Sequence, residues 1–386
     1  MRDAVICAAV RTPVGRRRGG LAGVHAADLS ATVLTALVDR TGIDPAVVDD
    51  VIWGCVTQVG EQTSNIGRVA VLAAGWPESV PGTTVDRQCG SSQQAVAFAA
   101  ATVVSGQADV VVAGGVESMS RVPMGSSVGD GSAGSPLGPA FLARYGGVAP
   151  HQGVGAELIA ARWGLSRTEL DEYALRSHER AGKARADGAF DEELVAVPTP
   201  DGTLVTADEG IRSGGTLERL AALPTPFQAG GVISAGNASQ LSDGAAALLV
   251  TTSDRAADLG LTPIVRVHTT VVAGDDPVAM LTAPIPATHK LLHRSGVRLS
   301  EIGLFEVSEA FASVPLAWLA ETGADPAQVN TRGGAIALGH PLGASGARVM
   351  TTLVHAMRSS GTRFGLQTMC EGGGLANATL LELVTD

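Results

Sequence analysis

The sequence predicts a layered α/β fold. Short runs of apolar and β-branched residues alternate with longer alanine-rich stretches, which is the pattern of strands and helices in turn. Several predicted strands are apolar at nearly every position, as expected for strands covered on both faces. A chain of 386 residues, 45% of them hydrophobic, is long enough for two or three packed units.

The predicted elements follow from these runs. Strands are expected where the apolar runs are short, at residues 4–8, 50–54, 108–113, 245–251, 264–268, 304–307, 364–369 and 378–383. Helices are expected in the alanine-rich stretches, at residues 26–40, 91–104, 153–163, 167–187, 277–295, 309–321 and 344–359.

Two stretches of the chain share one layout. In each, a candidate reactive residue, Cys89 or His340, precedes a helix, a Ser-Gly pair, a buried strand and a glycine-rich turn. This similarity favours an internal duplication of one α/β unit. The alternative is the strand–helix alternation of any α/β protein, and spacing alone does not separate the two interpretations. Between these stretches, from Ser118 to about Gln240, Gly, Pro and Ser are more frequent, which is typical of an inserted loop domain.

Composition and charge exclude several classes of protein. With 27 basic and 38 acidic residues, a net charge of −11 and few aromatic residues, the chain is not expected to bind nucleic acid. Mean hydropathy is +0.23, but the longest apolar run, residues 95–104, is far shorter than the roughly 20 residues that span a membrane. The four cysteines lie far apart, and no secretory signal is evident. We therefore expect a cytoplasmic protein without disulfides, whose partners are small molecules or proteins.

Cys89 is the strongest candidate for a catalytic residue. It stands before Gly90 and a predicted helix, where unpaired N–H groups and the positive end of the helix dipole favour a thiolate. We therefore expect the pKa of Cys89 to be lowered. Gly90 would let a substrate carbonyl approach backbone donors. A buried structural cysteine is the alternative.

His340 and Cys370 lie in two further glycine-rich loops. A proline at a helix start follows His340, and this context favours a working imidazole over a surface-loop histidine. Cys370 follows a predicted buried strand, and ligands gather at the carboxyl ends of strands in α/β sheets. Cys89, His340 and Cys370 meet only if the two halves pack face to face.

Other motifs have plainer explanations. The glycines of residues 129–134 match a dinucleotide fingerprint in spacing, but no strand precedes them and Pro136 follows. His289 and His293 are one helical turn apart without a third ligand nearby, so a solvated face is expected rather than a metal site. The run Arg16-Arg17-Arg18 is expected in a solvated loop, with a charged partner or a nucleotide phosphate as the alternative.

The ordered motifs resemble those of the thiolases, which make or cleave 3-ketoacyl-CoA by thiolytic Claisen chemistry. The matching segments span nearly the whole chain: Arg11-Thr12-Pro13, the Cys89 segment, Gly114-Gly115-Val116-Glu117-Ser118-Met119-Ser120, Asp208-Glu209-Gly210-Ile211-Arg212, Ala235-Gly236-Asn237-Ala238-Ser239, Ser308-Glu309-Ala310-Phe311-Ala312 and the loops of His340 and Cys370. The resemblance implies a duplicated five-layer α-β-α-β-α fold. Its parts would be an N-terminal half (1–117 and 242–262), an inserted loop domain for CoA binding and assembly (118–241) and a C-terminal half (263–386).

The resemblance also implies catalytic roles. Cys89 would become acylated, His340 would activate it and donate to an oxyanion, and Cys370 would act as general acid and base at the α-carbon of acetyl-CoA. The backbone N–H groups of Cys89 and Gly372 would form the second oxyanion hole. No metal or organic cofactor is implied beyond coenzyme A and acyl-CoA as substrates.

The CoA contacts would come largely from the loop domain. Arg212 would lie near the adenine and its phosphates, Ala235 and Ser239 along the pantetheine, and His151 and Phe227 in the tunnel wall. Phe311 is a further expected binding residue. The family also implies a homodimer or homotetramer.

The chain departs from the family pattern at several positions. Ser308 replaces an Asn that commonly holds a water of the first oxyanion hole, so that hole is expected to be shifted or weaker. Asp86 and Gln152 replace an Asn and a Met. Glu371 replaces an Ile or Val beside Cys370, where a carboxylate would raise the pKa of the thiol. Residues 370–377 are more similar to degradative thiolases that act on bulky or long acyl chains.

Three alternatives to a degradative 3-ketoacyl-CoA thiolase stay open. One is a biosynthetic acetoacetyl-CoA thiolase. Another is a ketosynthase, which usually pairs its cysteine with two histidines or with His and Asn, whereas the third group here is Cys370. The last is a catalytically idle CoA-binding homologue, which only the change at Ser308 favours. We therefore expect an acyltransferase, with a preference for the degradative reaction.

Overall fold

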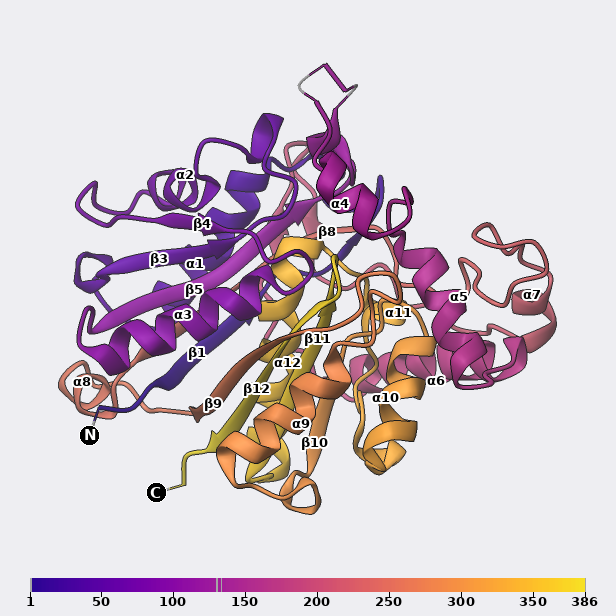
Figure 1. The fold of residues 1–386 in the computed structure, drawn as a ribbon. Helices are drawn as coiled ribbons and strands as arrows, with labels where there is room; N and C mark the ends of the chain where they lie inside the picture. Colours follow the sequence, from indigo (N-terminus) through magenta and orange to yellow (C-terminus); the bar gives the residue numbers. More distant parts are fainter. Residues whose placement is uncertain (1, 130, 133, 386) are drawn as a thin grey trace.

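A mixed β-sheet forms the centre of the protein (Figure 1). The computed structural model describes residues 2–129, 131–132 and 134–385. In that part of the chain the sheet has ten strands in the order β10-β11-β12-β9-β1-β8-β5-β3-β4, with the short β2 paired to β8. The strands are β1 (Val5–Arg11), β2 (Gly15–Arg16), β3 (Asp50–Gly54), β4 (Thr83–Val85), β5 (Val110–Ser118), β8 (Ser242–Thr251), β9 (Val265–Gly274), β10 (Leu304–Val307), β11 (Phe364–Glu371) and β12 (Leu375–Leu383). A separate hairpin consists of β6 (Val197–Pro198) and β7 (Leu204–Val205).

The sheet contains two copies of one strand arrangement. In the N-terminal half, β4 and β5 run parallel to β3, and β8 pairs antiparallel with both β5 and β1. In the C-terminal half, β10 and β11 are parallel, and β12 pairs antiparallel with both β11 and β9. The halves join where Val5 and Ile6 of β1 pair with Arg266 and Val265 of β9. This repeated order supports an internal duplication.

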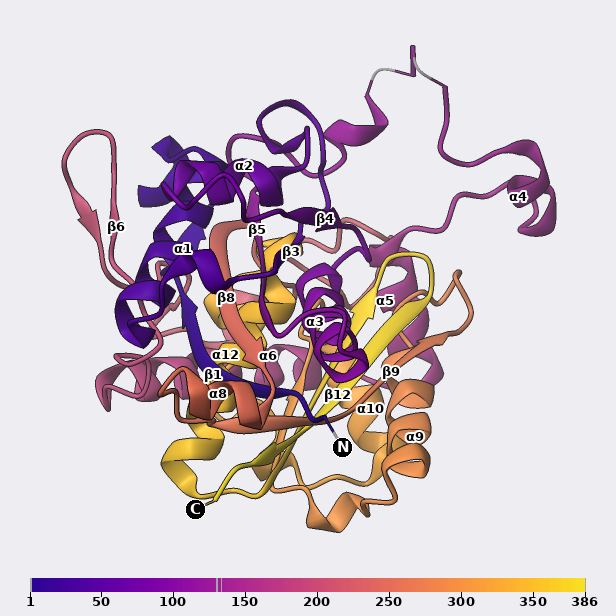
Figure 2. The same cartoon turned by 90° about the vertical axis from the view of Figure 1, so that its left-hand side faces the viewer.

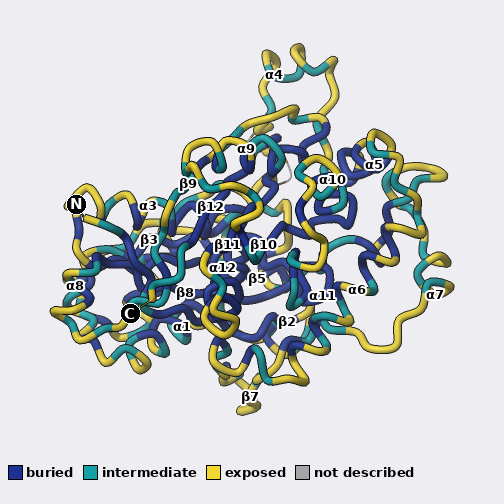
Figure 3. The backbone as a smooth tube through the Cα atoms, turned by 90° about the horizontal axis from the view of Figure 1, so that it is seen from below, coloured by how far each residue is buried: buried dark blue, intermediate teal, exposed yellow. Residues whose placement is uncertain are grey.

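Helices and sheet halves alternate in five layers, which confirms the expected fold class. On one outer side α1 and α2 pack against the N-terminal half around Leu34, and on the other α9 and α10 cover the C-terminal half around Trp318. In the middle, α3 and α12 share one core that includes Ala99 and Met350. The helices are α1 (Ala26–Thr41), α2 (Ile66–Ala73), α3 (Ser91–Ser105), α4 (Pro139–Arg144), α5 (Gln152–Arg162), α6 (Arg167–Ala186), α7 (Leu217–Ala221), α8 (Ser253–Asp258), α9 (Pro284–Ser295), α10 (Ser313–Thr322), α11 (Ala335–Leu338) and α12 (Leu342–Ser360). Figure 3 shows the buried backbone concentrated in these central elements.

The chain between β5 and β8 leaves the sheet and carries α4 to α7 and the β6–β7 hairpin. Figure 2 shows α4 standing away from the layered body, with the hairpin that contains β6 on the opposite side. The expected helices at residues 153–163 and 167–187 are present as α5 and α6. The domain boundaries at residues 118, 242 and 263 stay a prediction.

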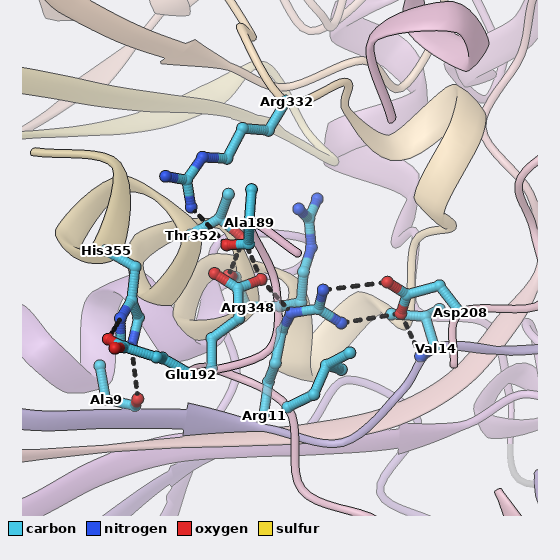
Figure 4. Close-up of polar contacts among 12 residues, drawn as sticks. Ala9, Arg11, Val14, Ala189, Glu192, Asp208, Arg332, Arg348, Thr352 and His355 are labelled. Carbon is cyan, nitrogen blue, oxygen red and sulfur yellow. Dashed lines mark hydrogen bonds and ion pairs between the residues drawn. The ribbon is translucent and has the colours of Figure 1, made fainter. Parts of the chain in front are cut away.

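A buried ion-pair network ties this inserted segment to the sheet (Figure 4). Arg11 at the end of β1 donates from Nε to Glu193 at 2.6 Å and from Nη1 to Asp208 at 2.7 Å, and all three side chains are buried. Glu193 also accepts the hydroxyl of Thr352 on α12 at 3.0 Å, and Asp208 accepts the N–H of Val14 at 2.8 Å. The paired charges fix the segment against both halves, because separating them would leave buried charges without partners.

Two predicted helices begin later than the sequence suggested. The helix expected from residue 277 begins at Pro284, and Met280 before it has a left-handed φ of +56°. The helix expected from residue 309 begins at Ser313, because the carbonyl of Ala310 accepts the N–H of Ser239 at 2.9 Å in a strand-like contact. The short elements α2 and β4 were not predicted. Both late starts lie beside the candidate site described below.

Candidate active site

Cys89 lies in a tight turn between β4 and α3. Gln88, directly before it, has a left-handed φ of +47°, a conformation that costs a residue other than glycine about 1–3 kcal/mol. Two side chains hold the turn. The Oδ1 atom of Asp86 accepts the N–H of Gln88 at 2.7 Å, and the hydroxyl of Ser91 donates to the Gln88 carbonyl at 2.6 Å. The turn places a half-buried Cys89 at the start of α3.

The expectation of a lowered pKa at Cys89 is wrong. Burial raises the pKa of the Cys89 thiol, and the neighbouring acidic groups of Cys370 and Glu371 raise it further. The start of α3 does favour a thiolate, but loss of hydration outweighs it at this position. The position of Cys89 at a helix start can be read from the sequence, but its burial by other segments cannot. Cys89 therefore rests as a thiol at neutral pH and needs a base to become a nucleophile.

His340 is held in one orientation by a serine on the following helix. Its Nδ1 atom lies 2.7 Å from the hydroxyl oxygen of Ser345, which in turn donates to the carbonyl of Pro341 at 2.8 Å. Since the hydroxyl has one proton and uses it on Pro341, this network assigns the imidazole proton to Nδ1. Burial and the positive charge of Arg348 lower the pKa of His340 to about 4, so the ring is neutral. Its Nε2 atom is buried and has no hydrogen-bond partner among the described residues, which leaves a lone pair available as a base.

Ser308 and His340 line one small internal cavity. Its volume is about 10 Å³, close to the space that one water molecule needs, and Arg348 and Glu306 also contribute to its wall. The hydroxyl oxygen of Ser308 is buried without a hydrogen-bond partner in the described part of the chain. A serine at this position therefore leaves a polar space next to Nε2 of His340 that a longer asparagine would reduce.

Cys370 lies at the end of β11 and is fully buried. Burial raises the pKa of its thiol to about 12, and the charge of Glu371 acts in the same direction. The expected effect of Glu371 on Cys370 is therefore confirmed in direction. Ser308 is close enough to Cys370 to oppose this shift and lower the pKa of the thiol. The contact connects Cys370 with the small cavity next to His340.

Glu371 is a buried carboxyl group that faces the Cys89 turn. Its side chain is fully inaccessible, and neither carboxyl oxygen has a hydrogen-bond partner among the described residues. A β-carbon added at Gly90 would lie 1.9 Å from Oε1 of Glu371, so glycine is required there. Burial raises the pKa of Glu371 to about 8, although the charge of Arg87 opposes the shift. The carboxyl group is therefore largely protonated at pH 7.

Helices α3 and α12 pack against each other, and an expected catalytic residue stands just before each of them. Cys89 and His340 hold equivalent places in the two halves, each two residues before the first residue of its helix. Cys89 and Gly372 line a single cavity of about 780 Å³, together with His151, Met280, Leu342 and the departure Gln152. Cys370 lies close enough to Cys89 to raise the pKa of its thiol. Cys89 and Cys370, from the two halves, are thus neighbours, and His340 lines the small cavity next to Ser308.

Four of the six expected CoA-binding residues line a second cavity, of about 760 Å³. Arg212, Phe227, Ala235 and Ser239 contribute to its wall. The ring of Phe227 lies 5.6 Å from that of His151, which lines the Cys89 cavity, and 5.9 Å from that of Phe311. These aromatic rings therefore stand between the two cavities. The two cavities are therefore neighbours, separated by the contact between Phe227 and His151.

Three supporting residues had no assigned role in the sequence analysis. Ser345 orients His340, as described above. Glu309 accepts hydrogen bonds from Tyr173, Ser177, Asn330 and the N–H of Ile336, and so holds the loop before His340. Glu117 accepts the N–H groups of Val56, Thr57 and Gly343, and so holds the loop after it. The signal for Glu117 is a glutamate within an otherwise apolar strand, whereas Glu309 lies two residues after β10 and has no comparable signal.

Several motifs from the sequence analysis lie outside the two cavities. A 3-10 turn at Ser126–Val128, rather than a strand, precedes the 129–134 segment, in which Asp130 and Ala133 lie outside the described residues. His289 and His293 are exposed on α9, and the described residues contain no group of three or more potential metal ligands. None of the four cysteines, all described, forms a disulfide. No described helix is long and apolar enough to cross a membrane.

Comparison with known proteins places these observations in one family. Residues 4–254 match the family model for the thiolase N-terminal domain, and residues 261–383 match that for the thiolase C-terminal domain. A steroid 3-ketoacyl-CoA thiolase of Mycobacterium tuberculosis is 50% identical, over 99% of this chain and 94% of the relative. A 3-ketoacyl-CoA thiolase of Pseudoalteromonas translucida is 42% identical over the full length of both chains.

The fold comparison agrees. The crystal structure of the Bacillus anthracis acetyl-CoA acetyltransferase superposes with a TM-score of 0.92 at 36% identity, covering 100% of this chain and 99% of that one. Family models cover both halves, and the relatives match over nearly their full length. The chain therefore belongs to the thiolase family of acyltransferases.

Proposed function

We propose that this chain cleaves a 3-ketoacyl-CoA with free CoA, giving acetyl-CoA and a shortened acyl-CoA, and that the reaction is reversible. The observation that carries the proposal is the nearness of the thiols of Cys89 and Cys370, with the unpaired Nε2 of a neutral His340 at the equivalent helix start of the other half. The relatives named 3-ketoacyl-CoA thiolases, at 42–50% identity, support the degradative direction.

In the first half-reaction, Nε2 of His340 takes the proton of Cys89. The Cys89 sulfur then attacks the 3-keto carbonyl, and the bond between C2 and C3 breaks. The carbanion of acetyl-CoA takes its proton from Cys370, which becomes a thiolate. The acyl group stays on Cys89, with its developing oxyanion next to the backbone N–H groups of Cys89 and Gly372. The Nε2–H of the protonated His340 donates to the oxygen of the departing enolate.

In the second half-reaction, the thiolate of Cys370 takes the proton of CoA. The CoA sulfur attacks the acyl-Cys89 thioester, and the Cys89 sulfur leaves and recovers its proton from His340. All three groups return to their starting protonation states. Only the two thiols, the imidazole and backbone donors take part, so we propose that no metal or organic cofactor is required. Unchanged turnover after treatment with a chelator would support this.

The deciding experiment is a thiolysis assay with free CoA, using acetoacetyl-CoA and a long-chain or steroid-type 3-ketoacyl-CoA, with Cys89→Ala as the control. Higher kcat/KM with the larger substrate supports the degradative proposal. A preference for acetoacetyl-CoA supports the biosynthetic alternative, which the similarity to the acetyl-CoA acetyltransferase structure favours. Activity on neither substrate, with CoA still bound, supports an idle homologue.

We further propose that the protein is a cytoplasmic homodimer or homotetramer. Strand β4 lies at the edge of the sheet in the described part of the chain, and the nearby helices α2 and α3 expose apolar residues, including Leu72 at 46% and Phe98 at 43%. An open edge with apolar neighbours suits pairing with a second copy. Light scattering coupled to size-exclusion chromatography measures the mass directly, and a monomer at micromolar concentration would contradict the proposal.

A further inference from the structure

All three arginines of the run Arg16-Arg17-Arg18 are exposed, as expected for a solvated loop, but they differ in their relation to the second cavity. Arg16 and Arg17 line the second cavity together with Arg212, whereas Arg18 is not among its lining residues. The guanidinium groups of Arg16, Arg17 and Arg212 make no hydrogen bond or ion pair with other described residues. Three unpaired cationic side chains therefore border one cavity in a protein whose net charge is −11.

The only carboxylate among the residues lining this cavity is turned toward the backbone of the arginine loop. Glu209 accepts the N–H of Arg16 at 3.0 Å and the N–H of Gly20 at 3.0 and 3.1 Å. A β-carbon at Gly19 would lie 2.1 Å from a carboxyl oxygen of Glu209, so the glycine permits this close approach. The carboxylate is thus engaged in fixing the loop and leaves the two guanidinium groups without a counter-ion.

The same contacts fix Arg16 and Arg17 relative to Arg212. The N–H of Glu209 donates to the carbonyl of Val14 at 3.0 Å, and Asp208 before it is paired with the buried Arg11. Residues 14–20 and 208–212 therefore form one hydrogen-bonded unit. These contacts hold the backbone that carries Arg16 and Arg17 next to the backbone that carries Arg212.

We propose that Arg16 and Arg17 bind the phosphate groups of coenzyme A, alongside Arg212. The inference rests on the proposed function and adds two residues to the substrate site. A phosphate monoester carries about −1.5 to −2 charges at pH 7, and guanidinium groups bind phosphate oxygens in pairs of hydrogen bonds. Phe227 lines this cavity and contacts His151 of the Cys89 cavity. A CoA with its phosphates at the arginines would direct its thiol toward Cys89.

Arg18 provides a matched control. It belongs to the same run and is exposed like Arg16 and Arg17, its backbone N–H donates to the hydroxyl of Ser120 at 2.7 Å, and its backbone is left-handed, with φ at +59°. It adds the same charge to the protein without lining the cavity. Loss of Arg18 measures the effect of removing one positive charge from the loop.

The test compares CoA, 3′-dephospho-CoA and pantetheine as the attacking thiol in thiolysis. For Arg16→Ala combined with Arg17→Ala, we expect the KM for CoA to rise about 10- to 100-fold, with kcat within about twofold. The KM for pantetheine should not change, and Arg18→Ala should behave as the wild type. An effect that disappears with 3′-dephospho-CoA assigns the 3′-phosphate, and one that persists assigns the diphosphate.

The proposal is overturned if the KM for CoA is unchanged, or if the KM for pantetheine rises equally. Arg16→Gln with Arg17→Gln should give the same result and keeps the length of the side chains. If the wild type shows no thiolysis, the proposed function fails, and calorimetric titration with CoA then decides this inference separately. Weaker binding in the double variant, with unchanged binding in Arg18→Ala, would still support it.

Discussion

The Nδ1 atom of His340 lies 2.7 Å from the hydroxyl oxygen of Ser345, and this hydrogen bond determines which nitrogen of the ring can act as a base. Because Ser345 donates its own proton to Pro341, Nδ1 holds the imidazole proton and Nε2 keeps its lone pair. The imidazole orientation thus depends on a serine one helical turn into α12.

Replacing Ser345 with alanine is expected to lower kcat/KM about 10-fold, because the loss of one hydrogen bond of about 1.4 kcal/mol frees the ring to turn and change tautomer. Steady-state thiolysis and the rate of Cys89 alkylation by iodoacetamide both measure the effect. Ser360→Ala removes a hydroxyl from the exposed end of the same helix and serves as the control. Equal rates for wild type and Ser345→Ala would refute the assigned orientation.

Cys89→Ala and Ser308→Asn should differ widely in turnover. The first removes the proposed nucleophile and is expected to lower kcat by about 10⁴-fold or more. The second changes one side of a cavity of about 10 Å³ and is expected to change kcat by less than about 10-fold. Mass spectrometry of the acyl-enzyme separates the two, since only Ser308→Asn should still form it. Equal losses would show that the role assigned to position 308 is wrong.

Glu371→Gln should increase the reactivity of Cys89 above pH 8 and leave it unchanged below pH 7. The pKa of Glu371 is raised to about 8, so the wild-type carboxyl is neutral at low pH and charged at high pH. The charged form raises the pKa of Cys89, and glutamine cannot acquire this charge. Alkylation rates of Cys89 across pH 6 to 10 test this, with Glu382→Gln as a control that removes one charge elsewhere. A pH-independent ratio between variant and wild type would contradict it.

The same residue should make stability depend on pH. An ordinary glutamate has a pKa of about 4.3, whereas the folded protein raises the pKa of Glu371 to about 8. The folded state therefore retains a proton that the unfolded state loses, and this contribution is complete below pH 4 and declines as pH rises to 8. Glu371→Gln should gain stability relative to wild type by roughly 1.4 kcal/mol for each pH unit across this interval. Urea unfolding at pH 5 and pH 8 measures the difference, and a constant difference would exclude the effect.

The sequence predicted the main strands because their character is local. The β5 segment, for example, is apolar from Val110 to Val116. The later start of α9, at Pro284, was missed because the left-handed backbone of Met280 before it is not visible in the sequence. The sequence also indicated Cys89, His340 and Cys370 through family motifs. It gave the wrong sign for the pKa of Cys89, because burial by distant segments decides that value.

Other features of the site could not be predicted from the sequence, because they too depend on contacts between distant segments. The cavity that Arg16 and Arg17 line is built from segments that meet only in three dimensions, near residues 16, 210, 227 and 240. Ser345 is one of many serines at helix starts, and only its 2.7 Å contact with His340 distinguishes it. Local sequence patterns therefore indicated the reacting residues. Their protonation states, and the side chains that orient them, depend on tertiary contacts.

The equivalent positions of Cys89 and His340 have a consequence for how such a site can arise. Each residue stands two places before the central helix of its half, and the two helices lie against each other. Two identical halves would present the same residue twice, as two thiols or two imidazoles. A nucleophile facing its base becomes possible only when one polypeptide encodes both halves and each can change alone. The reaction thus requires two halves that share one backbone fold but differ in the side chain at this equivalent position.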